Sequence, residues 1–198
     1  MKKNYILIGD SIVYGIGDYD NCGWTTQFKK YIMGKDNTKE CNNFANIAAF
    51  PGARSYNILD RIDNILDGYK YDDFKNIVIL SIGVNDTQCF NGVYSSSKES
   101  YKSNLESIIK KIKDRNFELI ILGLTKVGCK DKIEFKPNKI YDNEAILQYD
   151  EIVRNICSNN NISYIPMFDV LQIEDFIDGL HPNTDGHKKI FEEIIKNI

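Results

Sequence analysis

Short apolar runs and amphipathic stretches alternate along most of the chain. Five of the runs have the length of strands, and they cover the residues ending at position 8, then 44–49, 76–82, 119–124 and 162–165. The runs at 76–82 and 119–124 are almost entirely apolar, which is typical of strands that a parallel sheet covers on both faces. The pattern therefore predicts a buried, parallel sheet.

Between these runs, apolar residues recur every three or four positions, the spacing of one helix face. The stretches with this spacing cover 23–33, 55–66, 101–112, 145–156 and 190–195. Ser55 stands at the start of the second stretch and is a candidate N-cap. Because strand and helix alternate about five times, we expect an α/β fold with a doubly wound parallel sheet.

Polar and glycine-rich segments follow four of the predicted strands. They are Gly9-Asp10-Ser11, Pro51-Gly52, Gly83-Val84-Asn85-Asp86 and Asp178-Gly179-Leu180-His181-Pro182. Sheets of this kind bind ligands at the carboxyl ends of their strands, so we expect the four segments to converge on one edge. The segment 125–142 follows the fourth strand at that edge and lacks periodicity. A loop of this length is either a lid or substrate-selecting wall, or a surface excursion.

Composition and charge narrow the class of protein. A chain of 198 residues can bury roughly 70% of its unfolded surface in one domain, and we expect a single domain over 1–198. The net charge of -3, from 25 basic and 28 acidic residues spread evenly, gives no electrostatic reason for a nucleic acid or anionic membrane as partner. No apolar run is long enough to span a bilayer. The run after Met1-Lys2-Lys3 is too short for a signal peptide.

The cysteines point to a reducing compartment. They are odd in number, scattered and without CxxC pairs: Cys22, Cys41, Cys89, Cys129 and Cys157. This pattern indicates neither a disulfide framework nor a structural zinc site. We therefore expect reduced thiols and a cytoplasmic location, and the sequence leaves the oligomeric state open.

Ser11 is the candidate nucleophile, because it stands where the first strand meets a glycine-rich turn. A reactive serine needs a base that takes its proton and donors that hold the oxyanion. Of the two histidines, His187 falls within the last amphipathic stretch, where we expect a solvated helix face, and His181 lies in the loop before it. Asp178 can accept a hydrogen bond from Nδ1 of His181 in a tight turn, which leaves Nε2 facing Ser11.

Each of these residues also has a purely structural interpretation. Ser11 could cap a helix, and His181 could pack against the start of the last helix. Asn85-Asp86 is ordinary turn chemistry, and Gly52 could be needed only for a positive φ. Their joint occurrence at one predicted sheet edge favours a reactive site.

The four segments, in this order, resemble the motifs of the GDSL, or SGNH, hydrolase family. Gly9-Asp10-Ser11 matches the first motif, Gly52 the second, Gly83-Val84-Asn85-Asp86 the third and Asp178-Gly179-Leu180-His181-Pro182 the last. The resemblance spans residues 9 to 182. It implies a flavodoxin-like, three-layer α/β/α sandwich with a five-stranded parallel sheet.

The resemblance also implies an activity, that of a serine esterase or acylhydrolase that cleaves carboxylic esters through an acyl-enzyme, without metal or organic cofactor. Ser11 would be the nucleophile, His181 the general base and Asp178 the acid that orients it. The backbone N–H groups of Ser11 and Gly52 and the side chain of Asn85 would form the oxyanion hole. Three further matching residues would serve as framework: Asp10, Gly83 and Asp86.

Two functions from other classes fit parts of the pattern. A metal-dependent phosphoesterase could use Asp10, Asp86, Asp178 and His181 as ligands of one ion. A non-catalytic protein could bind an anion at Gly15-Ile16-Gly17, although this loop has neither a Walker lysine nor GxGxxG spacing.

The substrate is expected to be a small-molecule ester, and the fold and triad leave lipids, thioesters and acetylated sugars open. The absence of a long apolar lid segment favours short acyl groups. Arg54 could contact a substrate carboxylate or phosphate, or form a surface salt bridge. Tyr14, Tyr19 and Trp24 lie near Ser11 in sequence and could line a pocket or pack in the core.

Overall fold

Five parallel strands form the central sheet in the computed structural model, which describes residues 2–34 and 43–198. Their spatial order is β2 (Asn43–Ala49), β1 (Lys3–Gly9), β3 (Lys75–Ser81), β6 (Glu118–Leu122) and β9 (Ser163–Ile165). Each strand lies within one or two residues of its predicted run, and all neighbouring pairs are parallel. The predicted α/β class and five-stranded parallel sheet are confirmed.

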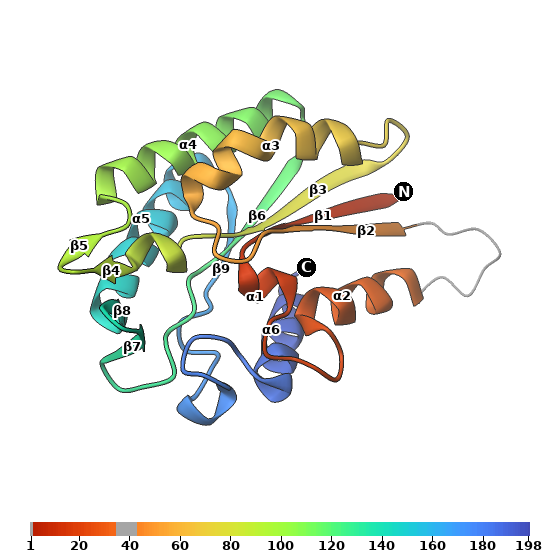
Figure 1. Ribbon diagram of the computed structural model, residues 1–198. Coiled ribbons are helices and arrows are strands. Elements are labelled where there is room, and N and C mark those ends of the chain that lie inside the picture. The colour runs from red at the N-terminus through yellow and green to blue at the C-terminus, as the bar shows by residue number, and fades with distance from the viewer. Residues whose placement is uncertain (1, 35–42) are drawn as a thin grey trace.

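Helices cover both faces of this sheet, so the molecule has three layers (Figure 1). One face is covered by α3 (Ser55–Tyr69), α4 (Lys98–Asp114) and α5 (Asn143–Asn160), and the other by α1 (Ser11–Tyr14), α2 (Gly23–Gly34) and α6 (Thr184–Lys196). Along β1, Ile6 and Ile8 face the first layer, whereas Tyr5 and Leu7 face the second. Both faces of the central strands are therefore buried, which explains their continuous apolar sequence.

The segment 125–142 contains regular structure, contrary to the loop expected from the sequence. Two of its parts form an antiparallel hairpin, β7 (Lys132–Lys136) and β8 (Lys139–Asp142). This hairpin pairs with β4 (Cys89–Phe90), which pairs with β5 (Val93–Tyr94), in a four-stranded sheet of order β5-β4-β8-β7. The alternation of charged and apolar residues over 132–136 and the following Pro137-Asn138 are local signals of a hairpin that the expectation of a loop overlooked, whereas the pairing of β8 with β4 joins distant parts of the chain.

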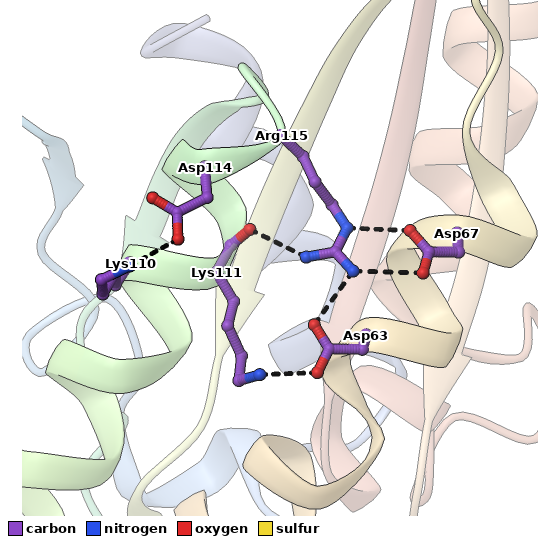
Figure 2. A network of polar contacts seen from close by, with 6 residues as sticks. All are labelled: Asp63, Asp67, Lys110, Lys111, Asp114 and Arg115. Carbon is purple, nitrogen blue, oxygen red and sulfur yellow. Dashed lines mark hydrogen bonds and ion pairs between the residues drawn. The ribbon is translucent and has the colours of Figure 1, made fainter.

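A polar network on the surface joins α3 to the end of α4 (Figure 2). The guanidinium of Arg115 contacts Asp67 through Nε at 2.8 Å and Asp63 through Nη2 at 3.0 Å. Lys111 contacts the other oxygen of Asp63 at 2.6 Å. Because these side chains are partly exposed, water screens the ion pairs and each contributes little to stability.

Four of the cysteines can be compared with the expectation of reduced thiols. Cys22, Cys89, Cys129 and Cys157 are free, and Cys41 lies outside the described residues. Across residues 2–34 and 43–198, no helix combines the length and the apolar character needed to cross a membrane.

Candidate active site

Ser11 is the first residue of α1, and one residue, Asp10, separates it from the carboxyl end of β1. The N-cap of this helix is Asp10, whose Oδ1 accepts the N–H of Ile12 at 3.0 Å. The alternative role of Ser11 as a helix cap is therefore wrong, since the preceding residue performs it. The Ser11 hydroxyl is left available, with the residue 6% exposed.

The glycines that follow Ser11 are explained by close backbone packing. Gly15 has φ 99°, and a side chain there would collide with the backbone of Cys22 and Gly23. Gly17 has φ 100° and lies against the carbonyl of Pro182. The loop after the short helix is thereby packed against the loop that contains His181.

His181 joins Ser11 to Asp178 through its two ring nitrogens. Nε2 lies 3.0 Å from Oγ of Ser11, and Nδ1 lies 2.7 Å from Oδ2 of Asp178. An ionised carboxylate can only accept, so Nδ1 carries a proton and Nε2 of the neutral ring is the acceptor that faces the hydroxyl. This arrangement allows the ring to remove the serine proton.

The turn before His181 holds Asp178 in place. Oδ1 of Asp178 accepts the backbone N–H groups of Leu180 at 2.9 Å and His181 at 2.7 Å. Partial burial disfavours the ionised carboxylate, but the hydrogen bonds from the His181 ring and from these two N–H groups outweigh it and hold its pKa below the ordinary value. Asp178 is therefore an anion at neutral pH.

Gly52 and Asn85 lie on two neighbouring loops at the same sheet edge. Gly52 has φ 79°, is exposed and has open space where a side chain would be, so its backbone is accessible. Asn85, in the 3-10 helix η1 (Val84–Thr87), is 7% exposed. Its Nδ2 donates to the carbonyl of Ala53 at 3.0 Å and to Oδ2 of Asp10 at 3.2 Å. The amide thus ties the Gly52 loop to the Ser11 turn.

Asp86, next to Asn85, is fully buried and holds two further loops. It accepts the N–H of Ser55 at 2.9 Å and the hydroxyls of Ser55 and Ser96 at 2.6 and 2.7 Å. The Ser55 hydroxyl therefore donates its hydrogen bond to Asp86. The predicted role of Ser55 as N-cap of α3 is wrong, because Arg54 occupies that position. Burial raises the pKa of Asp86, and burial together with the nearby Asp86 charge raises the pKa of Asp10 to about 7.

His187 is buried, so the prediction of a solvated helix face is wrong. Its Nδ1 accepts the N–H of Trp24 at 3.3 Å, and its Nε2 lies 3.0 Å from the carbonyl oxygen of Ile16. Burial of the ring lowers its pKa. The side chain joins α6 to the loop after Ser11, which the amphipathic pattern of one helix could not reveal.

Two residues of the hairpin in segment 125–142 reach the site, and neither was expected there from the sequence. Tyr141 donates its hydroxyl to Oδ1 of Asn85 at 3.1 Å. The ring of Phe135 packs edge-on against the His181 ring, with centroids 5.6 Å apart. The sequence signals that could have found them were the position of the segment after the fourth strand and the alternation of charged and apolar residues over 132–136.

The remaining candidate side chains lie as follows. Trp24 is a core residue at 1% exposed, whereas Tyr14 and Tyr19 are exposed. In the described part of the chain, Arg54 forms no salt bridge. Burial raises the pKa of Asp86 and of Tyr141, and the charge of Arg54 opposes this rise in both.

The carboxylates considered as metal ligands form hydrogen bonds to different partners. Asp10 caps α1, Asp86 binds the two serines and Asp178 binds His181. Within the described residues, no group of three or more His, Cys, Asp or Glu side chains is placed to hold a metal ion.

Comparison with known proteins extends this picture. The profile of the GDSL-like lipase/acylhydrolase family matches residues 7–189. Among curated proteins, no sequence match to the chain is found.

Solved structures share the fold at low sequence identity. An acetyl xylan esterase, AlAXEase, has a TM-score of 0.76 at 18% identity, over 98% of this chain and 99% of that one. A lipase/acylhydrolase from Enterococcus faecalis has a TM-score of 0.75 at 19% identity, over 98% and 94%. An acetylxylan esterase from Geobacillus stearothermophilus, solved as a catalytic mutant, has a TM-score of 0.76 at 15% identity, over 100% and 95%.

Proposed function

The chain belongs to the GDSL-like lipase/acylhydrolase family, and from this premise we propose that it cleaves carboxylic esters through an acyl-enzyme formed on Ser11. The observation that carries the proposal is the hydrogen-bonded series from Oγ of Ser11 through the His181 ring to Asp178, with contacts of 3.0 and 2.7 Å. Such a series supplies a serine with the base that it needs.

The reaction has two steps that use the same residues. Oγ of Ser11 attacks the ester carbonyl carbon while Nε2 of His181 takes the hydroxyl proton, and the tetrahedral intermediate then expels the alcohol, which receives that proton. Water attacks the acyl-serine, again losing a proton to His181, and the acid leaves as Ser11 regains its proton. Asp178 stabilises the imidazolium in both steps.

Three donors are proposed to hold the oxyanion: the N–H groups of Ser11 and Gly52 and the side-chain amide of Asn85. Each such donor is typically worth about 10² to 10³ in kcat. The accessible backbone of Gly52 supports its assignment. For Asn85, the longer 3.2 Å contact to Asp10 is the one that an oxyanion would replace.

We propose a small ester with a short acyl group as substrate. The segment 125–142 supports this, because it does not form a long apolar lid. It contributes a hairpin to a small four-stranded sheet, and the side chains of β7 in that hairpin are alternately exposed and partly buried. Two solved proteins of this fold are named acetyl xylan esterases, a name that denotes an acetylated substrate.

The test is hydrolysis of p-nitrophenyl acetate, butyrate and octanoate by the wild type and by Ser11→Ala, each with and without EDTA. A matched control is Ser158→Ala, which removes an exposed serine hydroxyl on α5. We expect Ser11→Ala to lower kcat by about 10⁴-fold or more, because the covalent route is lost, and the control to retain the wild-type rate. EDTA should have no effect.

Other outcomes would favour the other functions considered. Turnover that survives Ser11→Ala, or that EDTA abolishes, would contradict the serine mechanism and favour a metal-dependent phosphoesterase. Absence of turnover with all three esters would favour a binding protein. A higher kcat/KM for octanoate than for acetate would contradict the short acyl group alone.

A further inference from the structure

The hydroxyl of Tyr141 lies beside the amide that we assign to the oxyanion hole. Tyr141 belongs to β8 and is 2% exposed. Its hydroxyl oxygen is 3.1 Å from Oδ1 of Asn85 and 3.3 Å from Oε1 of Gln88. Both neighbours are acceptors, so the hydroxyl acts as the donor and these oxygens share its single proton.

This donor contributes to which end of the Asn85 amide faces which way. Oδ1 accepts the hydroxyl proton, so the bond favours the orientation in which Oδ1 faces Tyr141 and Nδ2 faces the opposite side. There Nδ2 contacts the Ala53 carbonyl and Asp10, between the Gly52 loop and the Ser11 turn. Burial raises the pKa of Tyr141 to about 12, so the hydroxyl keeps its proton at neutral pH.

We propose that Tyr141 is a positioning residue that holds the Asn85 amide with Nδ2 toward the reacting carbonyl. The proposal rests on the esterase function proposed above, and it adds a role for the hairpin that carries Tyr141. Without the hydroxyl, Oδ1 loses its donor from Tyr141, and the amide is held by the bonds of Nδ2 to the Ala53 carbonyl and Asp10. Because the oxyanion would replace the Asp10 contact, rotation of the amide by half a turn would then be opposed mainly by the Ala53 carbonyl, and the oxyanion would meet the amide oxygen in part of the molecules.

Strand pairing and ring contacts hold the hairpin beside the segment that carries Asn85. β8 pairs with β4, which begins four residues after Asn85, so that Tyr141 and Asn85 share one anchored unit. The Phe135 ring packs edge-on against Tyr141, with centroids 6.2 Å apart, and against His181. The hairpin therefore contacts both the general base and the oxyanion amide.

The test is a double-mutant cycle of Tyr141→Phe and Asn85→Ala, with kcat and KM measured on p-nitrophenyl acetate. The matched control is Tyr164→Phe, because the hydroxyl of Tyr164 also binds a side-chain oxygen, that of Asp150 at 2.6 Å, on an edge strand outside the site. Thermal unfolding of each variant fixes an assay temperature at which all are folded.

We expect Tyr141→Phe to lower kcat about 10-fold, which is a part of the 10²- to 10³-fold increase in kcat that one oxyanion donor supplies. KM should change by less than about twofold, because the contact acts in the transition state. In the Asn85→Ala background the same change should lower kcat by less than about twofold, since no amide is left to position. Tyr164→Phe should retain the wild-type kcat.

Three results would overturn the proposal, and they differ in what else they affect. An unchanged kcat in Tyr141→Phe, or an equal loss in both backgrounds, would refute the positioning role while the esterase mechanism stands. A wild-type kcat in Asn85→Ala would remove Asn85 from the oxyanion hole, and the role of Tyr141 with it.

Discussion

Replacing Asp178 with asparagine changes the group that faces His181 and leaves the rest of the turn intact. The oxygen of the new side-chain amide can still accept the N–H groups of Leu180 and His181, which lie 2.9 and 2.7 Å from Oδ1 in the wild type. The other oxygen, 2.7 Å from Nδ1 of His181, becomes an NH₂ donor. The ring must then place its proton on Nε2, which can no longer accept the proton of Ser11.

The expected loss in kcat is therefore large, and the expected loss in stability is small. A wrong tautomer of the base lowers kcat by about 10³ to 10⁴ in serine hydrolases that use such a triad. A hydrogen bond to a charged group contributes about 1.5 to 3 kcal/mol. The Asp178 side chain is 38% exposed, so screening by water should reduce the loss to about 1 kcal/mol or less.

The titration of Asp178 itself does not affect this comparison near neutral pH. The folded pKa of Asp178 is lowered from 3.8, so its contribution to stability is fully present above pH 3.8 and is lost as the pH falls through the lower, folded value. Between pH 6 and 8 the carboxylate is ionised in the folded and the unfolded chain. The titration of the Asp178 carboxylate itself therefore adds no pH dependence, within this range, to the difference in unfolding free energy between wild type and variant.

The measurements are kcat on p-nitrophenyl acetate and thermal unfolding. The control is Asp72→Asn, which makes the same change at a side chain that is 84% exposed and should leave both quantities unchanged. A kcat within tenfold of wild type for Asp178→Asn, with unfolding unchanged, would refute the assignment of Asp178 as the residue that orients His181.

Two other substitutions test the backbone donor at Gly52 and the buried ring of His187. Gly52→Ala should lower kcat about 10-fold or more by displacing an oxyanion donor. The control is Gly92→Ala, since Gly92 has φ 80° against 79° for Gly52 and is equally open; each variant should lose roughly 1 kcal/mol of stability, but Gly92→Ala should keep the wild-type kcat. Equal kcat values in the two variants would contradict the role of Gly52. His187→Gln should remove a pH dependence of the unfolding free energy, because burial lowers the folded pKa of His187 from 6.5. The stability of wild type relative to the variant, measured by denaturant unfolding, should therefore fall as the pH drops below about 6.5. A difference that does not change with pH would contradict the buried neutral ring.

The amino-acid sequence determined the central architecture, because that information is local. Strand length, apolar content and helical spacing depend on neighbouring residues, so the five strands and the helices between them were predicted to within a residue or two at the strand ends. The parallel arrangement then brings the strand ends to one edge. This is why Ser11 and His181, far apart in the chain, could be expected to face each other, and their catalytic roles stay a proposal.

Only the tertiary structure decided what packs against what. A helical stripe shows that a face is buried but not which partner covers the residues beside it, so the burial of His187 against Trp24 and Ile16 was missed. The hairpin of residues 132–142 is stabilised by pairing with β4, and the hydroxyl of Tyr141 meets Asn85 across 56 positions of sequence. Such contacts are fixed by the folded chain as a whole, because each partner becomes available only when the elements between them have packed.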